Sequence, residues 1–152
     1  MTVCSLDITR ADVAARVLDL QRQSYEVEAA LIGRRDLPPL HETLEDLRAC
    51  GETFFGVFER EQLAGAVSYK RLGDTVDVHR VMVRPAYFRR GVARTLVTFV
   101  ETCEEDARRF VVSTGSLNAP AKRLYAHLGF REMGEREVAP GLTITEFEKT
   151  RG

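Results

Sequence analysis

Residues 75–109 contain an abrupt change in hydrophobic periodicity, which limits the possible folds more than any other feature of the sequence. The valine-rich run that ends at Val83 is typical of a strand, with its period of two residues. From Arg89 to Arg109 the apolar residues recur every three or four positions, which is typical of an amphipathic helix. Pro85 and Gly91 lie at the junction. The sequence therefore predicts a strand, a tight loop and a helix in direct succession, as in layered α/β domains.

Similar patterns along the chain predict seven strands and four helices in one domain, residues 1–152. Thr9 or Asp12 is the expected cap of the first helix, and Gly33 its end. Two prolines in the connector 34–40 argue against regular structure there. The strands are expected near residues 3–8, 53–60, 62–72, 74–83, 110–114, 130–138 and 142–149, and the other helices near 42–51, 89–109 and 118–130.

The overall charge gives no sign of a polyanionic partner. Lysine and arginine number 22 against 23 aspartate and glutamate residues, for a formal net charge of −1. We therefore expect neither nucleic acid nor an acidic membrane as the main partner, and any positive site must be local.

The cysteines argue against both a disulfide framework and a metal site. Cys4, Cys50 and Cys103 are widely spaced and form no CxxC motif. Cys103 falls on the apolar stripe of the helix predicted after Gly91, so we expect it to be buried. Charged residues near the start interrupt any signal peptide, and no apolar run approaches the roughly 20 residues of a membrane helix. These features predict a cytoplasmic protein without a metal.

The loop before the long helix has the features of an anion-binding site. The first amides of a helix have no partners within it, and the helix dipole adds positive charge there. Gly91 has no Cβ, Ala93 is nearly as small, and Arg89, Arg90 and Arg94 add local charge. The alternative is a solvated helix start in which Gly91 serves only as a turn. No GxGxxG or GKS/GKT pattern indicates a nucleotide site.

This loop resembles motif A of the GNAT superfamily of N-acetyltransferases. In that family a strand is followed by Arg/Gln-x-x-Gly-x-Gly/Ala, and the loop amides bind the pyrophosphate of acetyl-coenzyme A. The loop here reads Phe88-Arg89-Arg90-Gly91-Val92-Ala93. Phe88 departs from the family pattern, because it retains the main-chain amide but offers no side-chain hydrogen bond.

Residues 118–130 are similar to motif B of the same family, with matches at Asn118, Ala121, Tyr125, Gly129 and Phe130. With both motifs, the resemblance covers essentially the whole chain. It implies an α/β fold, a single-domain twisted mixed sheet with helices on both faces in the order β-α-α-β-β-β-α-β-α-β-β. It also implies that the strands after 74 and 110 splay apart, with the pantetheine arm of the cofactor in the gap.

The resemblance further implies roles for individual residues. Tyr125 is expected to act as the general acid for the departing thiolate, since a phenol stays protonated at neutral pH. Asn118 is expected to cap its helix and contact the pantetheine, although the cap alone would explain it. Lys122 could reach the phosphates or be a solvated surface charge. The predicted cofactor-binding residues are Val81, Met82, Val83, Arg89, Arg90, Gly91, Val92, Ala93, Arg94, Asn118 and Lys122.

The general base has three candidates. Several family members have a carboxylate at the position of Asp77, and the imidazole of His79 is a chemically reasonable alternative. Both occupy odd positions, so we expect them to face the same side as Val81 and Val83. Bulk water is the third candidate.

The predicted function is acetyl-CoA-dependent transfer of an acetyl group directly to a primary amine. A CoA-binding module without turnover and a transferase for longer acyl chains are the alternatives. The family resemblance places acceptor recognition at Tyr25–His41 and Val138–Leu142, where the charges favour neither sign. The expected acceptor is a small-molecule or peptide amine, and many family members form homodimers.

Overall fold

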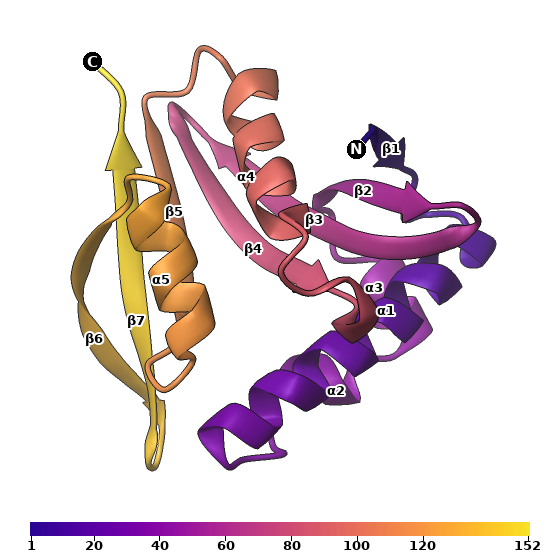
Figure 1. The fold of residues 1–152 in the computed structure, drawn as a ribbon, viewed down its shortest axis with the longest axis horizontal. Coiled ribbons are helices and arrows are strands. Elements are labelled where there is room, and N and C mark those ends of the chain that lie inside the picture. Colours follow the sequence, from indigo (N-terminus) through magenta and orange to yellow (C-terminus); the bar gives the residue numbers. More distant parts are fainter.

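The computed structural model describes residues 1–152 and contains one seven-stranded sheet in the order β1-β2-β3-β4-β5-β7-β6 (Figure 1). The strands are β1 (Val3–Leu6), β2 (Thr53–Glu59), β3 (Gln62–Leu72), β4 (Thr75–Val83), β5 (Arg109–Gly115), β6 (Arg131–Ala139) and β7 (Leu142–Thr150). The helices are α1 (Ala11–Ile32), α2 (Pro38–His41), α3 (Leu44–Arg48), α4 (Val92–Cys103) and α5 (Ala119–His127), with a 3-10 turn η1 (Pro85–Tyr87). The predicted α/β class and the predicted order of the main elements are confirmed.

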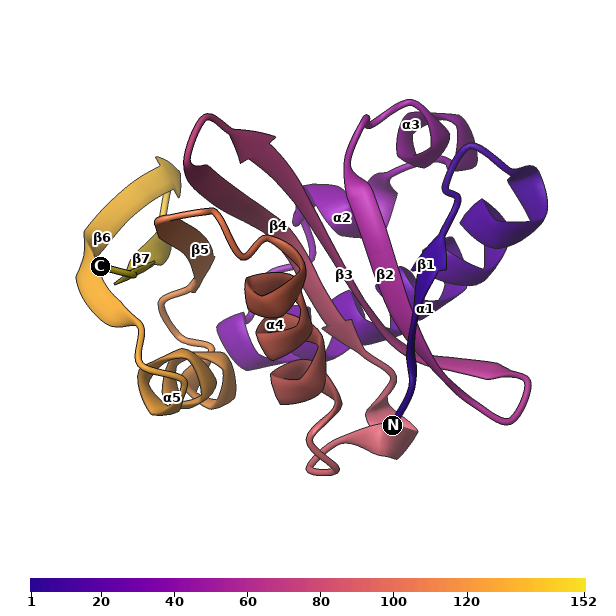
Figure 2. The same ribbon diagram turned by 90° about the horizontal axis from the view of Figure 1, so that it is seen from above.

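Helices cover both faces of this sheet, and each face has its own core. One core of 16 buried residues joins α4 and α5 to the central strands, with Leu96 and Tyr125 among its members. The other, of 11 buried residues, joins α1 and α3 to the opposite face, with Leu20 and Leu47 fully buried. Figure 2 shows α4 and α5 side by side along one face. This two-sided burial explains why β3 is continuously apolar from Leu63 to Val67.

The first helix ends where the sequence predicts, but it begins without the predicted cap. Gly33 has φ 74°, the left-handed conformation that closes many helices. Arg10 is the N-cap residue and makes no side-chain cap bond. Thr9 instead donates its hydroxyl to Asp7, so its side chain serves the preceding turn.

The connector after α1 is more regular than the sequence predicts. Two prolines argue against structure there, yet Pro38–His41 forms one helical turn. Both prolines occupy the first positions of α2, where an absent amide hydrogen costs nothing. The helix predicted near 42–51 is shorter, and Thr43 and Asp46 close its start as a capping box.

The long amphipathic helix is also shorter than its pattern suggests. It begins at Val92 and ends at Cys103, whereas the predicted range is 89–109. Cys103 is exposed, which contradicts the prediction of burial, because the helix ends there and the chain turns back toward β5.

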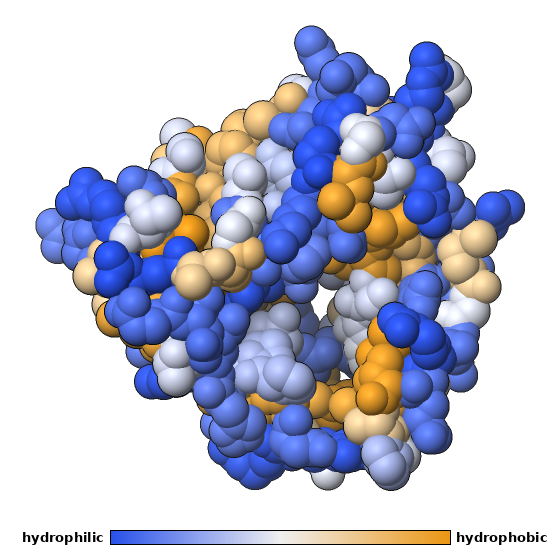
Figure 3. Space-filling model, turned by 180° about the vertical axis from the view of Figure 1, so that it is seen from behind, coloured by the Kyte–Doolittle hydropathy of each residue, from blue (hydrophilic) through white to orange (hydrophobic).

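The sheet opens between β4 and β5. These two strands pair in parallel only from Thr75 to Val78 on β4, opposite Arg109 to Val112 on β5. Beyond that point β5 continues along β7 and β4 along β3, so the strands diverge (Figure 1). Figure 3 shows the result from behind as a deep opening in the middle of the molecule. The splayed strands implied by the family resemblance are therefore present.

A β-bulge at His79 changes which way β4 presents its side chains. Val78 pairs with Tyr69 and Arg80 with Ser68, which leaves His79 without a partner. Val78 therefore lies in the α4-side core, and Val81 packs against the same core, while Met82 lies in the α1-side core.

The prediction that Asp77 and His79 face with Val81 and Val83 is wrong, because the extra residue reverses the alternation. Val76 and Val78 enter the α4-side core, so Asp77 between them points to the α1 side. His79 bonds Asp77 on that side, whereas Val81 and Val83 pack on the α4 side.

Candidate active site at the split between two strands

The loop predicted to bind an anion leaves several consecutive backbone amides without a partner. Arg89 and Gly91 have φ of 64° and 77°, and Gly91 is the N-cap residue of α4. The amides of residues 89–91 make no hydrogen bond within the protein, and the first helical bond runs from Thr95 N to Gly91 O at 2.9 Å. The next amides, Val92 to Arg94, have no partners because they begin the helix. Successive free amides around left-handed residues form anion-binding concavities.

The loop also has open space next to Gly91, where a ligand could approach the backbone. A Cβ on Gly91 would meet only the Cε atom of Met1, at 4.0 Å. By contrast, a Cβ on Gly65 of β3 would lie 2.5 Å from Cγ1 of Val92. Gly65 therefore allows the start of α4 to pack tightly on the sheet, which fixes the loop close to the end of β4. These residues fit a diphosphate group.

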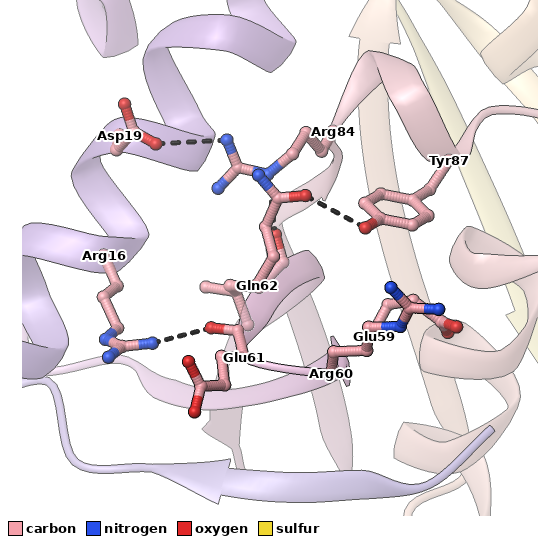
Figure 4. Close-up of a pocket in the computed structure, with 9 residues that line it drawn as sticks. Arg16, Asp19, Glu59, Arg60, Glu61, Gln62, Arg84 and Tyr87 are labelled. Atoms are coloured by element: carbon pink, nitrogen blue, oxygen red, sulfur yellow. Dashed lines mark hydrogen bonds and ion pairs between the residues drawn. The ribbon is translucent and has the colours of Figure 1, made fainter.

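Polar side chains hold both ends of the segment between β4 and this loop. The buried Arg84 donates to Leu63 O at 3.0 Å and pairs with Asp19 of α1 at 3.1 Å. The Tyr87 hydroxyl donates to Gln62 at 2.9 Å, and Arg90 lies over the Tyr87 ring. Figure 4 shows the contacts of Arg84 with Asp19 and of Tyr87 with Gln62 around a surface hollow of about 570 Å³. Acidic and basic side chains line that hollow in equal number, so we assign it an anchoring role only.

The free edge of β4 supplies main-chain groups to the gap. Arg84 N donates to Ala64 O of β3 at 2.8 Å. Because main-chain groups alternate along a strand, the N–H and C=O of Met82 also point toward β3. The main-chain groups of Val81 and Val83 then point the other way, toward the gap. Met82, predicted with them, has a fully buried side chain and its main chain on the β3 side.

A cavity of about 190 Å³ lies in the gap, and Tyr125 faces it from α5. The tyrosine is only 4% exposed and packs on Phe130 and Phe147, with ring centroids 5.8 and 5.6 Å away. Burial raises the pKa of its phenol, with smaller contributions from Tyr25 and Glu28. No side chain or carbonyl of the protein hydrogen-bonds its hydroxyl, which leaves the proton free for a ligand.

The two other predicted residues of α5 differ in position. Asn118 lines the same cavity, and its side chain also caps α5 by accepting from Ala121 N at 3.2 Å. Lys122 does not line the cavity; its Nζ lies 3.4 Å from Ser116 O and 3.9 Å from Glu132. The structure therefore brings Asn118, but not Lys122, to the gap.

His79 lies between two carboxylates. Its Nε2 is 3.1 Å from Asp77 Oδ2, and its Nδ1 is 3.3 Å from Glu52 Oε2. His79 lines the cavity with Tyr125, whereas Asp77 lines neither this cavity nor the neighbouring one. The imidazole, but not the Asp77 carboxylate, therefore lies on the cavity wall.

Next to His79 is a buried ionic network that the sequence did not reveal. Arg80 contacts Glu42 at 2.5 Å, Glu52 at 3.0 Å and Gln21 at 2.7 Å. Burial alone would raise the pKa of Glu52, but hydrogen bonds from Arg80 and Ser68 hold it below its ordinary value. The one available signal was an arginine within the valine-rich strand β4.

This network forms the floor of a second cavity of about 500 Å³, which shares Tyr25, His79 and Arg80 with the first. The two cavities therefore share a wall and lie side by side. The second cavity is polar, with one hydrophobic residue among the nine that line it. It is lined by Tyr25, Pro38, Pro39, His41, Glu42, Asp46, Glu52, His79 and Arg80.

The opposing charges of the predicted acceptor segment are largely used internally. Arg35 pairs with Glu26 at 2.5 Å, and Arg34 pairs with Asp36. Arg34 also donates to the Pro140 carbonyl at the β6–β7 turn, beside a small core of Ala29, Leu37 and Leu142. These contacts tie the α1–α2 connector to the far side of the gap.

No three His, Cys, Asp or Glu side chains are grouped so as to hold a metal ion. None of the helices combines the length and apolar character that crossing a membrane requires.

Comparisons with known proteins agree with this architecture. Residues 14–130 match the acetyltransferase (GNAT) family. The chain is 34% identical over 137 residues to the UPF0157 protein YqkA of Bacillus subtilis (strain 168); the match covers 90% of this chain but 40% of that relative's length.

Solved structures share the fold. An acetyltransferase from Thermus thermophilus superposes with a TM-score of 0.80 at 20% identity, covering 99% of this chain and 98% of the other. The PaiA N-acetyltransferase of Thermoplasma acidophilum, solved with coenzyme A, gives 0.74 at 15% identity, with 96% and 98% covered.

A split mixed sheet, with a glycine-containing loop of free amides at the end of one strand, is the fold that this chain shares with these acetyltransferase structures. The chain belongs to the acetyltransferase (GNAT) family.

Replacing Glu52 by Gln should lower the free energy of unfolding at neutral pH by about 3 kcal/mol, because buried Arg80 loses one charged partner. The folded-state pKa of Glu52 is depressed, so its contribution is present above 4.5 and is lost as the pH falls through the lower folded value. The difference in the free energy of unfolding between Glu52→Gln and wild type should therefore shrink as denaturant titrations are repeated at pH values progressively below 4.5. Glu45→Gln, at a side chain that is 78% exposed, is the control; an equal loss there would contradict the network's importance.

Proposed function

We propose that residues 1–152 form one acetyltransferase unit that moves the acetyl group of acetyl-CoA directly to a primary amine. The observation that carries this proposal is the unpartnered hydroxyl of Tyr125 in the gap where β4 leaves β5. The loop of free amides lies at the end of the same strand, so one extended thioester could contact both. The coenzyme A bound to the PaiA relative supports the choice of donor.

The donor is held mainly by main-chain groups. The amides of residues 89–94 receive the diphosphate, and Arg89, Arg90 and Arg94 add charge around it. Val81 and Val83 hydrogen-bond the pantetheine and the acetyl carbonyl, as an additional strand would, and Asn118 contacts the arm from the other side. Phe88, at the position where the family has Arg or Gln, is 42% exposed.

The chemistry needs a neutral amine, a polarised carbonyl and a proton for the thiolate. His79, oriented by Asp77 and Glu52, accepts a proton from the ammonium, with water as the alternative acceptor. The amine nitrogen then bonds to the carbonyl carbon. As the carbon–sulfur bond breaks, Tyr125 donates its proton to the thiolate, and the proton lost by the nitrogen restores the phenol. No covalent enzyme intermediate forms.

Substituting Phe for Tyr125 should lower kcat about 100-fold, because the thiolate loses its proton donor. The ring still packs on Phe130 and Phe147, so the dissociation constant of acetyl-CoA should stay within about twofold of wild type. Thiol release measures the first quantity and calorimetry the second. Equal losses in kcat and in acetyl-CoA affinity would show that Tyr125 is a binding residue instead.

The variant Gly91→Glu should weaken acetyl-CoA at least about tenfold, because a side chain and a negative charge would enter the diphosphate position. Gly73→Glu is the matched control: it also has positive φ, at 63°, with open space around it, but lies at a turn away from the loop. Calorimetry with acetyl-CoA should separate the two variants. Unchanged affinity in the Gly91 variant would refute the amide cradle.

A further inference from the structure

Glu28 of α1 is the carboxylate that faces Tyr125 across the cavity in the gap. The ionisable groups that line this cavity are Tyr25 and Glu28 of α1, His79 and Arg80 of β4, and Tyr125 of α5. Arg80 is already bonded to Glu42 and Glu52, so it is not available to Glu28. The contacts that lower the pKa of Glu28 are uncharged, namely the Asn118 side chain and the Gly115 main chain.

Glu28 is thus a half-buried acid without a cation. Burial raises the pKa of its carboxyl despite those two contacts. A Cβ on Gly115 would lie 3.5 Å from Glu28 Oε1, and the Gly115 main chain hydrogen-bonds the carboxylate, so the carboxylate lies against the end of β5. A buried carboxylate is stable as an anion when a cation joins it.

The surroundings indicate where that cation would come from. Tyr125, whose hydroxyl has no partner in the protein, lies on the same cavity, and Tyr25 connects it to the larger polar cavity of the acceptor side. Arg34 and Arg35, the cations of the nearby connector, are paired with Asp36 and Glu26. A ligand that enters from the larger polar cavity, which we call the acceptor cavity, is therefore the remaining source of a cation.

We infer that Glu28 binds the acceptor amine as an ammonium ion, so that the enzyme selects alkylamines that are cationic at neutral pH over arylamines. The inference rests on the proposed function and specifies the acceptor class of the same site. Glu28 holds the ammonium beside the thioester, and the proton leaves to His79 before the nitrogen attacks. Glu28 acts in binding, so its removal should change KM rather than kcat.

The experiment compares benzylamine with aniline, which share a ring but differ in charge at neutral pH, in thiol-release assays with saturating acetyl-CoA. Wild type should prefer benzylamine. Glu28→Gln, which keeps the shape and the acceptor oxygen, should raise the KM of benzylamine roughly 10- to 100-fold. The kcat for benzylamine, the constants for aniline and the affinity for acetyl-CoA should all stay within about threefold of wild type.

The control is Asp12→Asn, an exposed carboxylate at the far end of the same helix, which should behave as wild type. Calorimetry of benzylamine with the CoA-saturated protein gives a readout independent of turnover, and Glu28→Gln should lose its heat. An unchanged KM and heat in that variant would overturn the inference while leaving the transferase intact. Acetyl-CoA binding without thiol release from wild type with any amine would instead overturn the proposed function.

Discussion

The loss of hydrogen bonding between β4 and β5 after Val78 is the constraint on which the rest of the site depends. A continuous sheet would leave no gap, would pair the main chain of Val81 and Val83, and would bury Tyr125 without access. The bulge at His79 coincides with the divergence, so one extra residue both turns the imidazole toward α1 and reverses the strand beyond it. The core on the α4 side contains Val76 and Val78 of β4 as well as Phe110 and Val112 of β5, so it packs both strands beside the opening.

The charged side chains of the site form one closed network and leave one carboxylate, Glu28, outside it. Arg80, Glu42 and Glu52 satisfy each other beneath the acceptor cavity, and ionic networks of this kind give positional definition more than net stability. Glu52 also reaches His79, which connects this rigid floor to the proposed proton acceptor. Glu28 has no contact with this network and lines the cavity in the gap, together with Tyr125. The fixed charges thus orient the site while one carboxylate stays available to a ligand.

Local patterns predicted the elements well, and the errors have physical causes. Gly33, Asn118 and the strand periods placed most boundaries, because caps and alternation act within a few residues. Prolines were interpreted as breakers, although the first turn of α2 accepts them. The faces of Asp77 and His79 were wrong because a bulge depends on the partner strand. Arg80 was missed, and Glu28 could not be singled out among the acidic residues of the acceptor segment, because their surroundings come from distant neighbours.

By itself, the sequence determined the layered α/β class, the family and the amide loop before α4, since periodicity, capping and the two motifs are properties of short segments. Only the tertiary structure decided where β4 leaves β5, which side His79 faces, and which carboxylate meets Tyr125. Those outcomes depend on contacts between residues far apart in the chain, such as Glu28 with Gly115 or Glu52 with Arg80. Side-chain direction and charge compensation are settled only when such segments pack together.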